Sequence, residues 1–130
     1  WIMVGDDSPR QVYVSKISDP ASALFVTTGG EGFNIVHKNA IYERLNSTFG
    51  KTRSWGDCYG YYMVATGRAE IMVDPIISPW DIAAILPIIE EAGGMLTDWT
   101  GVPTIRGPNS VGSNGMVHDL VLDILSLSDD

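Results

Sequence analysis

The chain has 130 residues, of which 45% are hydrophobic and 18% are charged. This composition is typical of one globular domain with a buried core and excludes a disordered chain. Sixteen acidic residues against eight basic ones give a net charge of −8, which argues against nucleic acid or an anionic membrane surface as a partner. The single cysteine, Cys58, excludes an internal disulfide. Together with the absence of a signal peptide and of a membrane-spanning run, it predicts a cytoplasmic location.

The first half of the chain predicts strands around one helix. Residues 11–16 alternate polar and apolar side chains, as a half-buried strand does, and residues 18–20 predict a turn. Residues 23–28 are nearly continuously apolar and end at Gly29-Gly30, which is typical of a strand covered on both faces. From residue 33 to residue 46 apolar side chains recur at helical spacing, so this stretch predicts a single helix.

The second half of the chain continues the alternation of strands and helices. Strands are predicted at residues 51–55, 69–74, 95–99 and 110–113, and helices at residues 56–66 and 118–127. Gly67 stops the first of these helices, and Asn114 is the candidate cap of the second. This order predicts an α/β fold, with helices layered on a mixed or parallel sheet.

Residues 78–94 predict the central helix. Ser78 is a candidate N-cap, Pro79 suits the first helical position, and Gly93-Gly94 is a strong stop. Residues 82–89 are all apolar, which predicts burial on every side. Pro87 predicts a bend within one continuous helix, because it removes a hydrogen bond at a cost of about 3 kcal/mol. One carboxylate, Asp81, lies in the first turn, where it serves either the helix start or a ligand.

The same stretch carries a family resemblance. Trp80-Asp81 is followed by the small residues Ala83 and Ala84 and then by Glu91-Ala92-Gly93-Gly94. This spacing resembles the second signature of the inositol monophosphatase-like superfamily. Residues 55–61, 64–70 and 86–91 resemble its histidinol-phosphate phosphatase branch. The resemblance extends from Lys51 to the end of the chain and is loose before it.

The resemblance implies the C-terminal half of an αβαβα sandwich. Proteins of the superfamily are about twice as long, and their first half carries a Gly-x-Glu-Glu and an Asp-Pro-x-Asp-Gly-Thr element that supply most metal ligands. Neither element is present here; Asp74-Pro75 lacks the second Asp, the Gly and the Thr. We therefore expect residues 1–130 to form the α/β half that holds the substrate and part of the metal site, without the N-terminal catalytic half.

The resemblance assigns roles to a few residues, each of which has a structural alternative. Asp81 matches a catalytic Mg²⁺ ligand, against a helix-start carboxylate. Asp74 is placed to contact the hydroxyl or amine of the leaving group, against a turn Asp before Pro. Gly56 allows close approach of substrate, and Asp57 binds the amine or imidazole of histidinol or only begins a helix. Arg68 contacts substrate or only neutralises a helix end.

Structural roles are expected for several other conspicuous residues. Glu70 is a weaker candidate for the site, and Cys58 is expected to be a small buried residue. Trp80 is expected to wedge the turn that bears Asp81. A final set is expected at the surface (the histidines) or in the core (the aromatics): His37, His118, Trp55, Tyr59, Tyr61 and Tyr62.

The predicted function is Mg²⁺-dependent hydrolysis of a small phosphorylated metabolite. Histidinol phosphate, in histidine biosynthesis, is the first candidate and an inositol monophosphate is the second. The intact enzyme is expected to be a homodimer, as family members commonly are. The alternative is that the isolated chain is a catalytically incomplete binding module, since the other metal carboxylates are missing.

Overall fold

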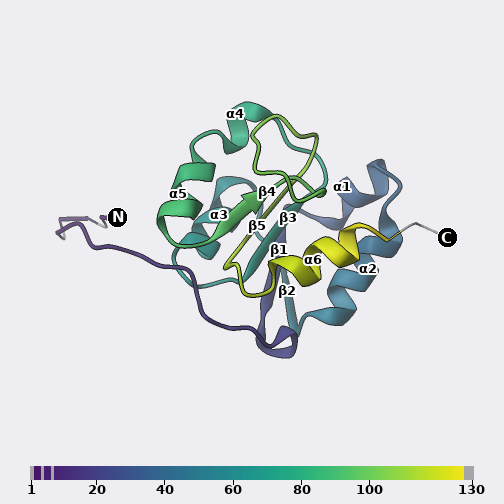
Figure 1. Cartoon of the computed structure of the whole chain (residues 1–130), viewed down its shortest axis with the longest axis horizontal. Coiled ribbons are helices and arrows are strands. Elements are labelled where there is room, and N and C mark those ends of the chain that lie inside the picture. The colour runs from purple at the N-terminus through teal and green to yellow at the C-terminus, as the bar shows by residue number, and fades with distance from the viewer. Residues whose placement is uncertain (1, 4, 7, 128–130) are drawn as a thin grey trace.

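The computed structural model describes residues 2–3, 5–6 and 8–127 and shows one sheet with helices on both faces (Figure 1). The sheet has five strands in the order β2-β1-β3-β5-β4. The elements in chain order are η1 (Pro20–Ser22), β1 (Leu24–Thr27), α1 (Gly30–Ile35), α2 (Asn39–Thr48), β2 (Lys51–Ser54), α3 (Asp57–Ala65), β3 (Ile71–Asp74), α4 (Pro79–Ile82), α5 (Ile85–Glu91), β4 (Met95–Thr97), β5 (Ser110–Ser113) and α6 (His118–Leu125).

The sheet is mixed, as the alternation of elements predicts. Strand β1 pairs in parallel with β2 and β3, whereas β5 pairs antiparallel with β3 and β4. The chain leaves β1 through α1 and α2 to reach β2, then returns through α3 to β3 on the other side of β1. Successive connections therefore leave neighbouring strand ends toward opposite faces, which opens a crevice at the carboxyl ends of the strands.

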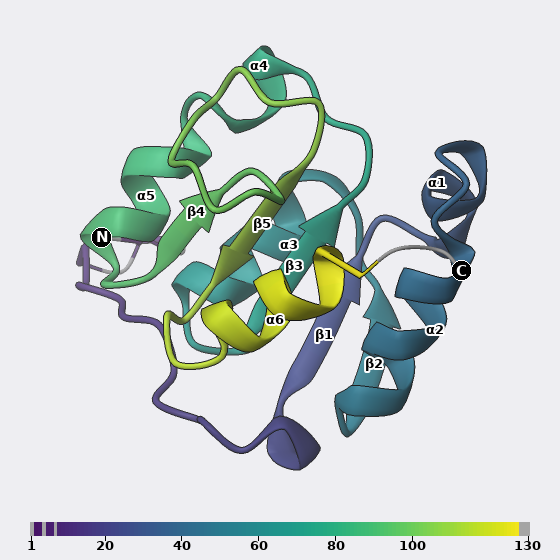
Figure 2. The same ribbon diagram turned by 45° about the vertical axis from the view of Figure 1, so that its right-hand side comes forward.

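The core lies on both faces of the sheet. Phe25, Ile71 and Val73 pack against α1, α2 and α6, whereas Val26 and Met72 face α3, α4 and α5. Figure 2 shows α6 in front of the sheet and α3 behind it. The continuous apolar run of β1 is buried on both sides, as predicted, because side chains alternate between two helix layers.

The predicted helix over residues 33–46 is two helices. The backbone of His37 is left-handed (φ 57°), and it ends α1. The Lys38 N–H donates to the Phe33 carbonyl at 2.8 Å and the His37 N–H donates to the Asn34 carbonyl at 3.1 Å. These two bonds form a Schellman motif. Helical spacing on both sides of the break concealed it, because no glycine stands at this position.

The central helix is also interrupted, and not at Pro87. It consists of α4 and α5, separated at Ala83 and Ala84. Pro87 is the third residue of α5, where the missing N–H has no partner within a helix in any case. The predicted burial on all sides is wrong for this chain: Ile82 and Ile89 are buried, but Ile88 is 50% exposed and Trp80 is 82% exposed. Trp80 therefore does not wedge the turn against other described residues.

Two predictions at the ends of the chain also fail. Residues 11–16 lie outside the sheet, and Val14 donates its N–H to the carbonyl of Ala92 at the end of α5. Asn114 does not cap α6, because the N-cap of that helix is Val117. The Asn114 side chain donates instead to the Ile17 carbonyl at 2.8 Å. Within the described residues, no helix combines the length and the apolarity that crossing a membrane requires.

Candidate active site

A cavity of about 500 Å³ opens at the carboxyl ends of the parallel strands. Its walls come from the segments that follow β1, β2 and β3 and from the first turn of α4. The lining residues are Thr28, Gly29, Glu31, Gly32, Ile35, Asp57, Cys58, Tyr61, Asp74, Pro75, Ile76, Ile77 and Asp81. The crossover topology therefore brings three of the predicted site residues, Asp57, Asp74 and Asp81, to one cavity.

Asp74 ends β3 at the base of this cavity and is 2% exposed. Its Oδ1 accepts a hydrogen bond from the Thr28 hydroxyl at 2.8 Å and a longer one from the Thr28 N–H at 3.4 Å. Its Oδ2 accepts one from the Tyr61 hydroxyl at 3.0 Å. Burial raises the pKa of Asp74, while the hydrogen bonds from Thr28 and Tyr61 oppose that rise. Each oxygen is thus held in place by a hydroxyl group.

Tyr61 connects Asp74 to the neighbouring strand. Its hydroxyl group, which donates to Asp74, also makes a short contact with the hydroxyl of Ser110, the residue opposite Asp74 in the β3–β5 register. Since the single Tyr61 proton goes to Asp74, Ser110 donates to Tyr61. Burial, followed by the charge of Asp74, raises the pKa of Tyr61, so this phenol stays protonated and remains a donor. The prediction that Tyr61 lies in the core is confirmed, and its buried hydroxyl group donates a hydrogen bond to Asp74.

Gly56 and Asp57 follow β2, and Asp57 lines one wall of the cavity. A Cβ atom on Gly56 would lie 2.9 Å from the Thr28 Cγ2, so the loop packs directly on Thr28. Asp57, the first residue of α3, has a left-handed backbone (φ 55°). Its N–H donates to the Thr28 hydroxyl oxygen at 3.4 Å. A left-handed backbone is uncommon for a residue other than glycine, and the hydrogen bond to Thr28 helps to hold it here.

Asp81 occupies the cavity rim in the first turn of α4. Its Oδ2 accepts the Ser78 N–H at 3.0 Å, as in the predicted cap. The side chain is exposed and lines the cavity. The cap bond holds the carboxylate in one orientation, and the hydrogen bonds of the described residues leave its Oδ1 unused.

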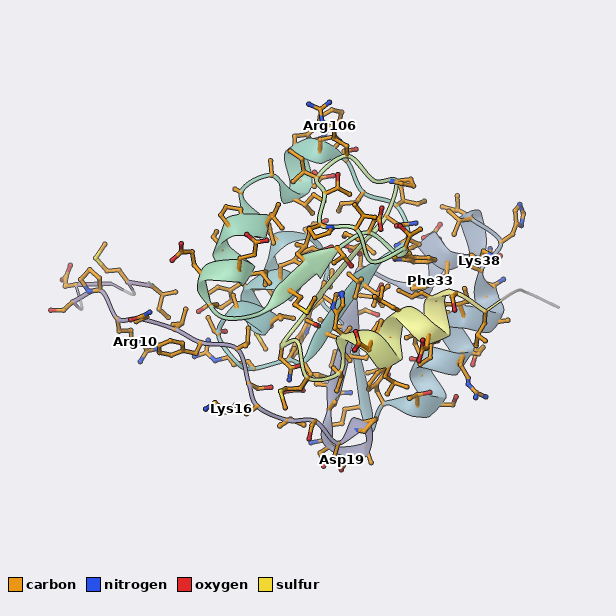
Figure 3. The ribbon with its side chains drawn as sticks, viewed as in Figure 1. Arg10, Lys16, Asp19, Phe33, Lys38 and Arg106 are labelled. Atoms are coloured by element: carbon orange, nitrogen blue, oxygen red, sulfur yellow. The ribbon has the colours of Figure 1, made fainter. Side chains whose placement is uncertain are left out.

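The cavity is strongly acidic. Four carboxylates line it, those of Glu31, Asp57, Asp74 and Asp81, and none of the lining residues is Lys, Arg or His. The basic side chains labelled in Figure 3 lie at the periphery of the molecule. In a crevice with low-dielectric walls, this distribution of charge favours a cationic ligand over an anion.

The described residues do not form a complete site for a metal ion. Among residues 2–3, 5–6 and 8–127, no group of three or more His, Cys, Asp or Glu side chains is arranged to hold one. Mg²⁺ requires near-octahedral coordination by oxygen. Asp74 accepts hydrogen bonds from two hydroxyl groups, whereas Asp81 Oδ1 accepts none from the described residues.

Other candidate residues lie away from the cavity. Arg68 follows α3 at the end opposite Asp57 and donates to the Tyr62 hydroxyl at 3.2 Å. Glu70 is buried at the opposite end of β3. His118 is 1% exposed, so its prediction as a surface residue is wrong, whereas His37 is exposed as predicted. Cys58 is exposed at the cavity wall, not buried.

The aromatic residues near α3 divide between core and surface. Tyr59 is 52% exposed and Trp55 is 37% exposed, and their rings pack on each other edge to face. Their prediction as core residues is therefore wrong for these two. Tyr62 is half-buried and stacks on Tyr59.

Four residues of the site escaped prediction: Thr28, Tyr61, Ser110 and Glu31. Thr28 carried one usable signal, since it directly follows the buried parallel strand β1 and precedes Gly29-Gly30. Such strand ends meet at one edge of the sheet. Ser110 and Tyr61 carried none, because only the β3–β5 register and the packing of α3 bring them to Asp74.

Fold and site together define an α/β protein with an acidic crevice at the carboxyl ends of its parallel strands. The family model described as "Inositol monophosphatase family" matches residues 10–126, and the chain belongs to that family. The family resemblance carried by Trp80-Asp81 is thereby confirmed.

Curated and solved relatives agree with this assignment. A histidinol-phosphatase of Chlorobaculum parvum is 45% identical over 87% of this chain, and one of Mycobacterium tuberculosis is 33% identical over 91%. A fructose-1,6-bisphosphatase/inositol-1-monophosphatase of Thermotoga maritima is 34% identical over 85%. The structure of an IMPase from Thermotoga maritima superimposes with a TM-score of 0.79 at 30% identity, covering 89% of this chain and 45% of that one.

The chain spans less than half the length of these relatives. It covers 44% of the Chlorobaculum parvum protein and 45% of the Mycobacterium tuberculosis protein. An inositol monophosphatase from Zymomonas mobilis shares the fold with a TM-score of 0.81, and 47% of that chain is covered. A match to less than half of each relative agrees with the prediction that this chain corresponds to one half of a larger sandwich.

Proposed function

We propose that the intact protein hydrolyses a phosphate monoester and that this chain binds the leaving alcohol. Histidinol phosphate is the proposed substrate and histidinol plus phosphate are the products. The family and the two histidinol-phosphatase relatives support the reaction class. The observation that carries the substrate choice is the acidic cavity, with four carboxylates and no basic lining residue.

The charge of the cavity separates the two candidate alcohols. Histidinol carries an ammonium group and an imidazole ring, whereas inositol carries only hydroxyl groups. An ammonium group beside Asp57 and Asp74, held in a half-enclosed cavity, gains more from two carboxylates than a hydroxyl group does. Inositol monophosphate remains the second candidate, because the Thermotoga maritima relatives bear that activity in their names.

The chain's own part in the reaction is to bind and orient. Asp74, clamped by Thr28 and Tyr61, offers fixed acceptor oxygens to the alcohol. Asp57 provides a second acid on the facing wall. We propose that hydrolysis by the intact protein requires Mg²⁺ and that Asp81 supplies one of several ligands. We also propose that the protein acts in histidine biosynthesis in the cytoplasm, where a reducing environment suits the free thiol of Cys58.

The substrate assignment is tested on the full-length parent protein with Mg²⁺. We expect kcat/KM for histidinol phosphate to exceed that for inositol 1-phosphate at least about tenfold, which corresponds to about 1.4 kcal/mol of transition-state binding. Equal or faster turnover of inositol 1-phosphate would overturn the histidinol assignment.

The role of Asp81 is tested by Asp81→Asn in the same protein. We expect kcat to fall at least about a hundredfold, which corresponds to about 2.7 kcal/mol. Asp123→Asn, the same substitution on the exposed side of α6, is the matched control and should leave kcat unchanged. Full activity of Asp81→Asn would remove it from the metal site.

Titration of the isolated 130-residue chain with Mg²⁺ distinguishes an incomplete metal site from a complete one. Since the described residues hold no group of three side chains arranged for a metal ion, we expect the isolated chain to bind Mg²⁺ weakly, with a Kd on the order of millimolar or above. Isothermal titration with MgCl₂ measures this. Micromolar affinity would show a further metal site in the chain.

A further inference from the structure

Thr28 links the two acids of the cavity. Its hydroxyl donates to Asp74 Oδ1 at 2.8 Å, and the same oxygen atom accepts the Asp57 N–H at 3.4 Å. A threonine hydroxyl has one proton and two lone pairs, so it can make both bonds at once. Thr28 stands at the carboxyl end of β1, between the strand that ends in Asp74 and the strand that leads to Asp57.

The packing around Thr28 leaves this link little freedom. A Cβ atom on Gly56 would come within 2.9 Å of the Thr28 Cγ2 and 3.2 Å of its Cα. The loop before Asp57 therefore rests on the methyl group and backbone of Thr28, while the hydroxyl group holds the N–H of Asp57. This contact supports the left-handed backbone of Asp57 (φ 55°).

We propose that Thr28 is the positioning residue of the leaving-group site, whose hydroxyl holds the Asp74 carboxylate and the Asp57 backbone in register for one ligand. The identity of that ligand, a cationic amino alcohol, rests on the proposed function. The hydrogen-bond linkage itself does not. Thr28 acts through the two acids and has no chemical step of its own.

The proposal predicts a change in Asp74 even without a ligand. Burial already raises the pKa of Asp74, and the Thr28 hydrogen bond is the largest influence that opposes the rise. Removing that donor should raise the pKa of Asp74 further. The titratable groups around Asp74 are Tyr61, which stays protonated, Asp57, whose charge raises the pKa of Asp74, and the other cavity-lining groups of Glu31, Cys58 and Asp81.

Three variants separate the hydroxyl group from the shape of the side chain. Thr28→Val keeps the shape and removes the hydroxyl, and Thr28→Ser keeps the hydroxyl. Thr27→Val is the matched control, because Thr27 is the preceding residue and its buried hydroxyl has no partner among the described residues. The first measurement follows the Asp74 carboxyl carbon by ¹³C NMR against pH, in the chain without ligand. Thr28→Val should shift its midpoint upward, while Thr28→Ser and Thr27→Val should match the wild type.

The second measurement is steady-state hydrolysis of histidinol phosphate by the full-length parent. Thr28→Val should raise KM about tenfold and change kcat by less than about threefold, since a contact to the leaving group is present in both ground and transition states. Thr28→Ser should restore KM to within about threefold of the wild type. In an Asp74→Asn background, Thr28→Val should raise KM by a smaller factor than it does in the wild type, because the two residues share one interaction.

The outcomes separate this proposal from the proposed function. An unchanged Asp74 midpoint in Thr28→Val, or a Thr28→Ser variant as defective as Thr28→Val, overturns the positioning role whatever the substrate is. A shifted midpoint that Thr28→Ser restores supports it, even if wild-type protein fails to hydrolyse histidinol phosphate. In that case the histidinol assignment fails and the positioning role stands.

Discussion

Strand β3 has a buried acid at each end, and the two acids have different surroundings. Glu70 immediately precedes the strand and Asp74 ends it, and they are 3% and 2% exposed. Both side chains are carboxylates and both are buried, so neither burial nor residue type distinguishes the roles of the two acids. What differs is the set of partners at each end of the sheet and the space beside each carboxylate.

The Glu70 end is closed. Its carboxylate accepts the backbone N–H of Leu24 at 2.6 Å and the Ser15 hydroxyl at 2.8 Å. Asn114 donates to that same Ser15 hydroxyl oxygen and to the Ile17 carbonyl. These bonds fasten the segment before η1 to the sheet. Glu70 does not line the acidic cavity, so its carboxylate is a structural clamp.

The Asp74 end is open. Its partners are the hydroxyl groups of Thr28 and Tyr61, and its carboxylate borders a cavity of about 500 Å³. Burial raises the pKa of Asp74, and the available hydrogen bonds do not cancel that rise. A buried acid therefore indicates function when its own fold leaves it incompletely stabilised and next to empty space.

The largest effect on stability is expected for Glu70→Ala. The substitution leaves the Leu24 N–H and the Ser15 hydroxyl without their acceptor in a buried region, which should lower the free energy of unfolding by about 3 kcal/mol. Urea denaturation measures the loss. Glu43→Ala, an exposed glutamate on α2, is the control and should change little. A Glu70→Ala loss below about 1 kcal/mol would contradict the clamp.

Unlike Glu70→Ala, Asp74→Asn should not lower the free energy of unfolding at neutral pH. A raised pKa means that the folded protein binds a proton more tightly than the unfolded chain does. The stability contribution of Asp74 is therefore greatest below its unfolded pKa and falls as pH rises through the raised folded pKa. Asn does not ionise, so the free energy of unfolding at pH 7 should stay equal or increase. Urea curves at pH 4 and pH 7 measure the difference, and a clear loss at pH 7 would give Asp74 a clamp role like that of Glu70.

His118 extends the closed end and adds a pH dependence. Its Nε2 meets the Thr97 hydroxyl at 3.0 Å and its Nδ1 meets the Ser113 hydroxyl at 2.8 Å. Since Thr97 donates its proton to the Asp98 carbonyl, Nε2 carries the hydrogen and Nδ1 accepts from Ser113. Neutral histidine thus satisfies every partner, and burial lowers the pKa of His118 despite the nearby charge of Asp119.

The linkage has a definite direction for this histidine. Its stability contribution is complete above the unfolded pKa, about 6.5, and is lost as pH falls from there through the lowered folded pKa. The free energy of unfolding should therefore rise between pH 5 and pH 7. His118→Gln should flatten that rise, whereas His37→Gln, at the exposed histidine, should retain it. An unchanged slope in His118→Gln would show that the slope arises elsewhere.

The smallest effect is expected for Thr27→Val. Thr27 is fully buried, and its hydroxyl is an unpaired polar atom within the described part of the chain. Valine has the same shape and needs no partner, so the free energy of unfolding should stay equal or increase by about 1 kcal/mol. Thermal denaturation detects this. A loss above about 1 kcal/mol would show that the hydroxyl has a partner in solution.

Local sequence patterns predicted most of the elements. All five strands of the sheet lie within predicted strand segments. β1, β3 and β4 are mainly apolar and lie close to a Gly or a Pro, whereas β2 is polar and largely exposed. Gly67 and Gly93 end α3 and α5 with left-handed backbones (φ 72° and 88°), as helix-stop glycines should. His37 performs the same role without a glycine, and this is why two helices were predicted as one.

The candidate site divides in the same way. Asp81 follows from a local pattern, because the cap of Ser78, the proline at position 79 and the carboxylate all act within one helical turn. Asp74 and Asp57 follow from strand and helix ends together with the family resemblance. Arg68 was predicted on the same grounds, yet α3 carries it to the end opposite Asp57. A linear pattern does not state which end of an element faces the ligand.

By itself the sequence determined the α/β layers, the strand and helix ends with glycine or proline, and the acid in the Trp80-Asp81 turn. These features depend on backbone conformation and hydrophobic period within a few neighbouring residues. Only the tertiary structure decided that Thr28 and Tyr61 hold Asp74, with Ser110 bonded to Tyr61, while Leu24 and Ser15 hold Glu70. Those partners lie on separate segments, and strand order, register and the packing of α3 and of the segment before η1 bring them within hydrogen-bond distance.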